Sequence, residues 1–278
     1  TPTGLTYGSY TDTTSNTVQY TYLAVGNGGK MFRATDLNTW TAITPVVSAN
    51  LNAAEYGFAK FIAVGAGGSI IYSTDTKIWT QSAKITSQNL NALTANGSMA
   101  IAVGDNGAIV TSKDAITWTV ASSVPTSAHL YGITFTNAGT WVAVGAGGTI
   151  LTSGDGLTWT AQNSGSTADL KAVGSIASFT NNVTSYQFIV VGANGTILSS
   201  PDAITWTAQS ANTKANFNAL ASTNQFLAVG SGGTVVTSLD GITWKTQASQ
   251  TTANLTSLLR AENMYIAVDN SGGTIYSK

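Results

Sequence analysis

One phrase recurs along this chain and constrains its fold more than any other feature. Its clearest copy is Ala-Val-Gly-Ala-Gly-Gly-Thr-Ile-Leu-Thr-Ser-Gly-Asp-Gly-Leu-Thr-Trp-Thr, at residues 143–160. Five further complete copies occupy residues 24–41, 63–80, 102–119, 190–207 and 228–245, and a seventh begins at Ala267 and stops at Lys278. The aspartates of successive copies lie 39, 39, 41, 47 and 38 residues apart. A period near 40 with strand-like segments is typical of a β-propeller with one four-stranded blade per repeat.

The repeat therefore predicts an all-β chain, a seven-bladed β-propeller of antiparallel four-stranded blades. We expect a single domain, because each repeat needs its neighbours to bury its faces. Within a repeat, strand B ends in Ala-Val-Gly, a glycine-rich hairpin leads to a β-branched strand C, and the Ser-x-Asp-x-x-x-Trp turn leads to strand D. The blades are expected at residues 4–43, 50–83, 89–122, 129–163, 169–210, 216–248 and 254–278.

The N-terminal segment 5–10 has two interpretations. It is either strand A of the first blade or a strand D that completes the last one. The second interpretation leaves about ten residues for an A strand, a turn and the start of strand B, which is too few. We expect strand A, followed by a long loop through residues 13–18, with a similar insertion through residues 180–185 in the fifth repeat.

The seventh repeat contains segments for strands A, B and C, at residues 255–259, 265–268 and 274–277, but shows no strand D. Strand C of this blade is therefore expected to be an open edge, which natural sheets usually protect. Three explanations remain, in order of preference: the natural chain continues past Lys278, the blade has three strands, or a partner supplies a strand by β-augmentation.

Composition excludes several classes of function. Hydrophobic residues make up 43% of the chain and charged residues only 8%, with a net charge of −1. There is no basic stripe, so nucleic acid is not an expected partner. The absence of cysteine excludes disulfides and thiolate metal sites. No run of 18 apolar residues is present, and direct membrane insertion is not expected. The abundance of Thr, Ser and Asn is typical of a secreted or surface-displayed bacterial protein, with the periplasm or an equivalent lumen as the alternative location.

The repeated aspartate and tryptophan are expected to be structural. A carboxylate at a hairpin corner accepts N–H bonds from its own turn. One carboxylate per blade cannot converge on a single ion, so neither a metal nor a cofactor is expected. A large aromatic residue at a fixed repeat position is normally core, although sugar stacking is the alternative. The aspartates are Asp36, Asp75, Asp114, Asp155, Asp202 and Asp240, and the tryptophans are Trp40, Trp79, Trp118, Trp159, Trp206 and Trp244.

Catalytic groups are scarce, and we predict that the protein is not an enzyme. A sialidase needs three arginines around the substrate carboxylate, and this chain has two, Arg33 and Arg260. With His129 as the only histidine, a Ser–His–Asp triad or a histidine-rich zinc site has no support. The glycine-rich turn leads to a strand, whereas a nucleotide motif would open a helix. A glycosidase pair would have to come from the acids outside the boxes, which are Glu55, Glu262, Asp12, Asp105, Asp169 and Asp269.

The more promising site is a ring of polar side chains at the start of strand A, on the face that carries the D–A and B–C loops. Asparagine amides offer both donors and an acceptor, which suits a peptide backbone or sugar hydroxyls. Alternatively, these groups bond to neighbouring backbone and hold channel water. Thr256, and Thr6 in the first blade, complete the second tier. The predicted ring is Asn50, Asn52, Asn89, Asn91, His129, Tyr131, Asp169, Lys171, Asn216, Asn218 and Asn254.

Four members of this ring break the repeat and belong to two adjacent blades, the fourth and the fifth. They are His129, Tyr131, Asp169 and Lys171. Recognition is expected first at such a local departure from symmetry.

The Ser/Thr-x-Asp motif resembles the Asp box, or BNR repeat, of sialidases and other propellers. The whole phrase Ala-Val-Gly-x-Gly-Gly-x-Ile-x-x-Ser-x-Asp-x-x-x-Trp resembles the repeats of the photosystem II assembly factor (Ycf48-like) family, within the sialidase-like superfamily. This resemblance covers nearly the whole chain and implies a seven-bladed, non-catalytic propeller outside the cytoplasm. The family carries an arginine-rich patch, which Arg33 and Arg260 alone cannot form.

Three hypotheses of function follow. The preferred one is a non-enzymatic, exported binding or scaffold propeller that engages a protein partner or builds a surface structure. The second is a carbohydrate-binding lectin that uses polar sites on the D–A/B–C loop face. The third is a glycoside hydrolase.

Overall fold

The computed structural model describes residues 2–12, 14–37, 39–136, 139–180, 183–261 and 264–277, with the backbone alone at residues 276 and 277. The chain forms two compact units, residues 1–122 and 123–278. Both units consist of antiparallel sheets whose strands pair in chain order, and the regular structure of the described residues is strand except for single 3₁₀ turns. The sheets are numbered one to seven in the order in which they occur.

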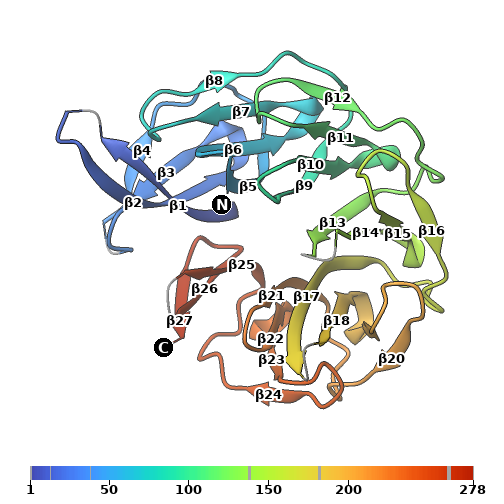
Figure 1. Cartoon of the computed structure of the whole chain (residues 1–278). Coiled ribbons are helices and arrows are strands. Elements are labelled where there is room, and N and C mark those ends of the chain that lie inside the picture. The colour runs from blue at the N-terminus through green and yellow to red at the C-terminus, as the bar shows by residue number, and fades with distance from the viewer. Residues whose placement is uncertain are drawn as a thin grey trace. The chain divides into compact units, whose positions relative to one another are not determined.

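The first unit contains sheets one to three, coloured blue to green in Figure 1. Their strands are β1 (Pro2–Asp12), β2 (Thr17–Gly26), β3 (Met31–Ala34) and β4 (Thr41–Ile43); β5 (Leu51–Gly57), β6 (Lys60–Gly65), β7 (Ile70–Ser73) and β8 (Thr80–Gln81); and β9 (Leu90–Ala95), β10 (Ala100–Gly104), β11 (Ile109–Ser112) and β12 (Trp118–Val120).

The second unit contains sheets four to seven. Their strands are β13 (Leu130–Phe135), β14 (Trp141–Gly145), β15 (Ile150–Ser153) and β16 (Thr160–Gln162); β17 (Leu170–Thr180), β18 (Val183–Gly192), β19 (Ile197–Ser200) and β20 (Thr207–Gln209); β21 (Phe217–Ser222), β22 (Phe226–Gly230), β23 (Val235–Ser238) and β24 (Lys245–Gln247); and β25 (Leu255–Ala261), β26 (Met264–Asp269) and β27 (Thr274–Ser277). Sheet seven has three strands, as the seventh repeat predicted.

The core of each unit lies between successive sheets. In the second unit, the second strand of sheet six, β22, is a run of apolar residues buried on both faces, because one face meets sheet five and the other meets sheet seven. In one such cluster, Ile189 and Val191 of sheet five pack with Phe226, Val236 and Trp244 of sheet six. A sheet therefore buries its faces only with its neighbours, which explains the repeat.

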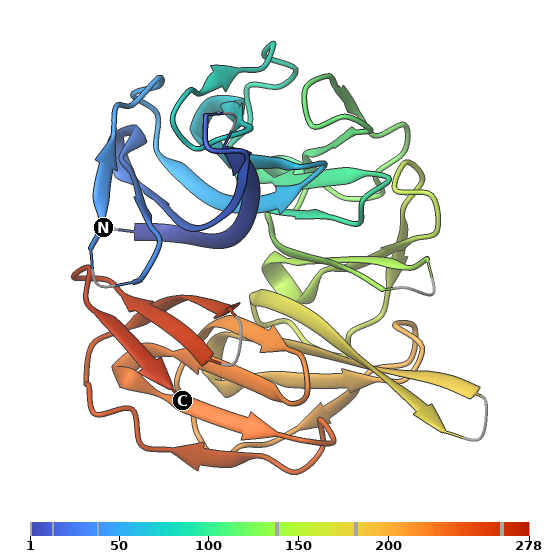
Figure 2. The same cartoon turned by 60° about the vertical axis from the view of Figure 1, so that its left-hand side comes forward.

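The N-terminal segment is the first strand of sheet one, so its interpretation as strand A is confirmed. The expectation of a long loop after it is wrong, because β1 and β2 remain paired as far as Asp12 and Thr17. The fifth repeat behaves in the same way: β17 and β18 pair out to Thr180 and Val183, and their hairpin (yellow) projects from its sheet in Figure 2. The paired residues of these insertions are mostly β-branched (Thr17, Val18, Thr180, Val183 and Thr184), so they extend the ladder instead of leaving it.

In sheets one to six, the glycine-rich turns between the second and third strands are 3₁₀ turns, such as Ser231–Gly233 between β22 and β23. Gly232 and Gly233 have φ angles of 63° and 69°. A Cβ at Gly233 would lie 1.9 Å from the carbonyl oxygen of Thr251, whereas nothing lies within 4 Å of one at Gly232. Asparagine replaces the first of the two glycines in two other turns, but the second glycine cannot be replaced without moving the backbone.

Candidate functional site

The boxed aspartates hold their own turns. The Oδ1 atom of Asp240 accepts hydrogen bonds from the backbone N–H groups of Ile242 (2.8 Å) and Thr243 (2.7 Å) and from the Ser238 hydroxyl (2.9 Å). These N–H bonds, that from Thr243 first, lower the pKa of Asp240 to about 2. The same bonds recur at Asp114, Asp155 and Asp202.

The repeated tryptophans pack beside these turns. The indole N–H of Trp244 donates to the carbonyl oxygen of Gly241 (3.2 Å), and the side chain is 9% exposed. Equivalent N–H bonds to the residue three positions earlier occur at Trp40, Trp79, Trp159 and Trp206. Trp79, Trp118, Trp159 and Trp244 are less than 10% exposed, so their rings offer little surface on which a sugar could stack, whereas Trp40 and Trp206 are half-buried.

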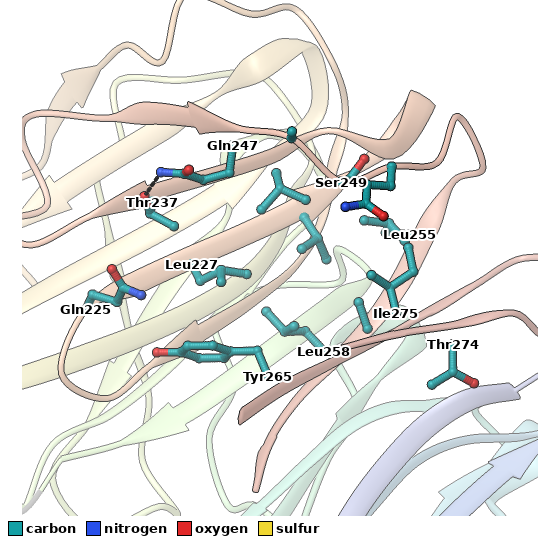
Figure 3. Close-up of a pocket in the computed structure, with 15 residues that line it drawn as sticks. Gln225, Leu227, Thr237, Gln247, Ser249, Leu255, Leu258, Tyr265, Thr274 and Ile275 are labelled. Carbon is teal, nitrogen blue, oxygen red and sulfur yellow. Dashed lines mark hydrogen bonds between the residues drawn. The ribbon is translucent and has the colours of Figure 1, made fainter. Parts of the chain in front are cut away.

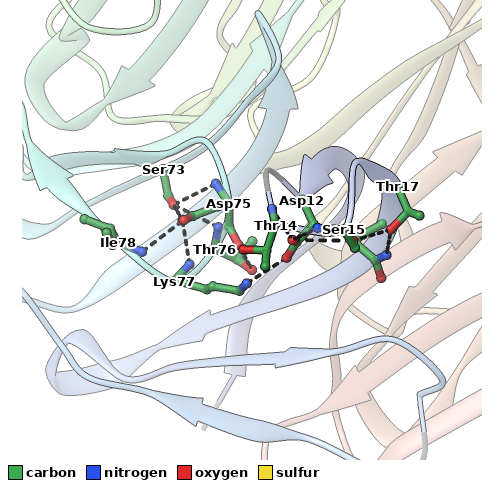
Figure 4. A network of polar contacts seen from close by, with 10 residues as sticks. Asp12, Thr14, Ser15, Thr17, Ser73, Asp75, Thr76, Lys77 and Ile78 are labelled. Carbon is green, nitrogen blue, oxygen red and sulfur yellow. Dashed lines mark hydrogen bonds and ion pairs between the residues drawn. The ribbon is translucent and has the colours of Figure 1, made fainter.

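The acids outside the boxes have local partners. Asp12 accepts bonds from the backbone N–H groups of Thr14 (2.9 Å) and Ser15 (3.1 Å) in its own hairpin (Figure 4). Its Oδ2 atom pairs with Lys77 Nζ at 3.0 Å, beside the Asp75 turn. This pairing with Lys77 is the main cause that lowers the pKa of Asp12 to about 2. Asp12 therefore joins two turns of the first unit.

Asp105 and Asp269 also bond close by. Asp105 accepts bonds from the amides of Asn89 (2.8 Å) and Asn91 (2.9 Å). Asp269 accepts bonds from the N–H groups of Ser271 and Gly273, both at 2.8 Å, and so closes the turn between β26 and β27.

Glu55 is the acid with the most unusual environment among the described residues. Its carboxyl group, on β5, accepts a bond from the Tyr56 N–H (3.1 Å), and desolvation raises the pKa of Glu55 to about 7. Glu262, the other glutamate considered for a glycosidase pair, lies outside the described residues. The described residues contain no group of three or more His, Asp or Glu side chains that could hold a metal ion.

The asparagine that precedes strand A joins successive sheets. The Oδ1 atom of Asn254 accepts the N–H of Gly232 (2.9 Å) in the turn of the preceding sheet. Asn216 does the same with the N–H of Asn194 (2.8 Å). In the first unit, Asn50 and Asn89 hold the turns before them through the same bond. These amide oxygens therefore satisfy backbone groups of the neighbouring sheet.

The second tier of the predicted ring also contributes bonds between sheets. Asn52 Nδ2 donates to the Leu90 carbonyl (2.9 Å), and Asn218 Nδ2 donates to the Leu255 carbonyl (2.8 Å). The prediction that Thr6 is the member of this tier in sheet one is wrong. Gly4 pairs with Val25 as Ala53 pairs with Val64, so Thr3 occupies the register of Asn52, and its hydroxyl contacts the Leu51 carbonyl.

In the second unit the four ring residues that break the repeat form one cluster. Lys171 Nζ lies 3.6 Å from the centre of the Tyr131 ring and 3.1 Å from Asp169 Oδ2. The rings of His129 and Tyr131 are nearly parallel, with centroids 6.5 Å apart and an interplanar angle of 18°. Lys171, followed by the N–H of Gly147, lowers the pKa of Asp169 below its ordinary value. This cluster (His129, Tyr131, Asp169 and Lys171) joins the first strands of sheets four and five.

The described residues contain no helix long and apolar enough to span a membrane.

Comparison with solved structures shows which known fold the chain adopts. No protein-family model and no curated protein sequence matches the chain. Among solved structures, it is similar to YCF48 bound to D1 peptide, with a TM-score of 0.73 and 20% identity over 92% of this chain and 87% of that one. YCF48 from Cyanidioschyzon merolae superimposes with a TM-score of 0.70 and 17% identity, over 99% and 94% of the two chains.

The fold is that of a seven-bladed, Ycf48-like β-propeller. The WD40 β-propeller domain of Doa1 also matches, with a TM-score of 0.74 and 12% identity over 100% of this chain and 93% of that one. The seven sheets are the blades of this propeller, and the three-stranded seventh sheet is its incomplete blade.

Proposed function

We propose that this propeller is a non-catalytic binding protein that recognises a polypeptide partner through the cluster of His129, Tyr131, Asp169 and Lys171. The observation that carries the proposal is the contact between these four side chains, at the one place where aromatic and charged groups replace the repeated asparagines.

The cluster has the chemistry of a peptide site. His129 is exposed, and Tyr131 and Lys171 are half-buried, so two rings and an ammonium group present a rigid surface of mixed character. Tyrosine at such a surface supplies a large contact area at a low cost in entropy. Asp169 and Lys171 add one charge of each sign, which suits the amide groups and charged side chains of a peptide. One structural neighbour, YCF48, was solved with D1 peptide bound, which supports the same class of ligand here.

Binding to the repeated asparagines is a weaker explanation, since the amides of Asn52, Asn216, Asn218 and Asn254 already bond to backbone. Four of the six repeated tryptophans are less than 10% exposed, which leaves the lectin hypothesis little stacking surface.

The test is a peptide array probed with the purified protein, followed by titration of the strongest peptide against Lys171→Ala and Tyr131→Ala. We expect each substitution to weaken binding about tenfold or more, because cation and aromatic anchors dominate such interfaces. Lys245→Ala, an exposed lysine on β24, is the matched control and should bind as the parent does. Equal binding by both cluster variants, or binding on a glycan array alone, would refute the proposal.

A further inference from the structure

The charged residues of blades four to six are divided between the two ends of their sheets. At the end that carries the boxed turns, three aspartates and one lysine give a net charge of −2, and these residues are Asp155, Asp202, Asp240 and Lys245. At the end that carries the predicted ring, two lysines and one aspartate give a net charge of +1, and these residues are Asp169, Lys171 and Lys214. Residues 123–248 contain no other Asp, Glu, Lys or Arg. The ring end of these blades therefore favours an anionic ligand.

Lys214 departs from the repeat, as the cluster does. It stands two residues before Asn216, in the loop that leads to β21, and its side chain is exposed. Within the described part of the chain, its ammonium group has no hydrogen-bond or ion-pair partner. The other five D–A loops carry a hydroxyl residue at this position, and these residues are Ser48, Ser87, Ser127, Thr167 and Thr252.

One turn of blade five connects Lys214 to the cluster. The backbone N–H of Ala193 donates to the carbonyl oxygen of Asp169 (2.8 Å), and the N–H of Gly195 donates to the carbonyl oxygen of Ala215 (2.9 Å). A Cβ at Gly195 would lie 3.2 Å from the Cα atom of Lys214. The same turn therefore contacts the loop of Lys214 and the backbone of Asp169.

The site has more hydrogen-bond donors than acceptors to offer a ligand. Both carboxylate oxygens of Asp169 already accept bonds, Oδ1 from the N–H of Gly147 (3.2 Å) and Oδ2 from Lys171 Nζ (3.1 Å). An ammonium group has three N–H donors, and Lys171 uses one of them for Asp169 while its Nζ atom faces the Tyr131 ring. With Lys214, two ammonium groups can still donate, whereas the one carboxylate is engaged.

The next D–A connection carries no such charge. Figure 3 shows this region, from Gln247 at the end of β24 to Leu255 at the start of β25, and every side chain labelled there is uncharged. Thr252 stands where Lys214 stands one blade earlier. In the second unit, the positive charge at this end therefore belongs to blades five and six.

We propose that the cluster and Lys214 recognise an acidic peptide segment, whose glutamate or aspartate carboxylates pair with Lys171 and Lys214. This inference rests on the proposed function and adds the charge of the peptide to it. Carboxylates accept charge-assisted bonds from the two ammonium groups, whereas a basic segment meets two charges of its own sign. The rings of His129 and Tyr131 contact the residues beside the carboxylates.

The test compares three rhodamine-labelled, C-terminally amidated peptides by fluorescence anisotropy. The first is Ser-Glu-Leu-Glu-Ala-Glu-Ser, and the other two have glutamine or lysine in place of all three glutamates. We expect the glutamate peptide to bind about tenfold more tightly than the glutamine peptide, and the lysine peptide to bind most weakly. The preference for glutamate should fall as the salt concentration rises from about 50 mM to about 500 mM, because salt screens exposed charges.

Substitutions of Lys214 test its part in this preference. Lys214→Ser introduces the residue type of the other loops and should lower the preference for glutamate about threefold, with binding of the glutamine peptide unchanged. Lys214→Arg should keep the preference, because it keeps the charge. Lys245→Ser removes the same charge at the other end of the sheets and is the matched control, which should bind as the parent does. Circular dichroism confirms that each variant is folded.

The results separate this inference from the proposed function. Equal binding of the glutamate and glutamine peptides, or equal effects of Lys214→Ser and Lys245→Ser, would overturn the inference. If Lys171→Ala and Tyr131→Ala still weaken peptide binding in that case, the proposed function stands without it. Absence of binding by all three peptides at millimolar concentration would also overturn the inference, and the peptide array then decides the proposed function by itself.

Discussion

Blades six and seven begin alike and end differently. Both have a buried second strand and a third strand in the same register, but blade six adds β24, with Asp240 and Trp244 ahead of it. In blade seven, Tyr265 and Ile275 stay partly exposed, whereas Phe226 and Val236 are buried. The comparison shows that the boxed turn and its tryptophan are part of the buried core between two blades.

The hairpin turns of the two blades also differ. In blade six, a Cβ at Gly230 would lie 2.0 Å from the carbonyl oxygen of Asn216. Blade seven has Asp269 at this position, and its carboxylate accepts N–H bonds from Ser271 and Gly273. A turn of the same length is thus held by a carboxylate that the repeat does not contain.

Of the substitutions that test this comparison, Trp244→Ala should cause the largest loss of stability. Removal of a buried tryptophan leaves a cavity, so we expect a loss of about 3–5 kcal/mol in the free energy of unfolding. Tyr265→Ala should cost less, about 1–2 kcal/mol, because its ring is only partly covered. Urea denaturation of both variants measures the difference, and equal losses would show that Trp244 is not part of the interface core.

Asn218→Ala should cause the second largest loss of stability. Its amide bonds to the Leu255 carbonyl in the next blade, and we expect a loss of about 1–2 kcal/mol when that carbonyl is left without its partner. The counterpart Thr256 bonds within its own blade, to Val268 at 3.3 Å, so Thr256→Ala should cost about 0.5 kcal/mol. Thermal denaturation of the two variants tests this order. A larger loss of stability for Thr256→Ala would show that the bond between blades is not the stronger of the two.

The smallest effect should be the pH dependence of the boxed turn. The pKa of Asp240 is about 2 in the folded protein, below the value of about 3.9 in an unfolded chain. Its contribution to stability is therefore present above about pH 4 and is lost as the pH falls toward 2. Melting temperatures from pH 6 to pH 2 should fall less steeply for Asp240→Asn. An unchanged slope would mean that this carboxylate does not favour the folded state.

The repeat predicted most of the fold, including the four-stranded sheets and the incomplete seventh blade, because period and turn residues are local properties of the chain. It failed at the register of β1, where Thr6 was expected as the counterpart of Asn52 but Thr3 occupies that position. It also failed where inserted residues continued a ladder. Pairing depends on the partner strand, which the local pattern does not contain.

The candidate site divides in the same way. The departure of His129, Tyr131, Asp169 and Lys171 from the repeat could be read directly from residue types. Their contacts could not, since Tyr131 and Lys171 lie 40 residues apart on different sheets and meet only because β13 and β17 pack side by side. The role of Asp269 could not be predicted from the repeat either. It stands where the other repeats have glycine, and its carboxylate accepts the N–H bonds that hold the turn.

By itself, the sequence determined the blade: its four strands, its glycine turn and its aspartate-held corner, because each of these needs only residues within one repeat. Tertiary structure alone decided which asparagines are occupied by backbone bonds and which side chains cluster. Both depend on packing between blades, where the neighbouring blade supplies the bonding partner.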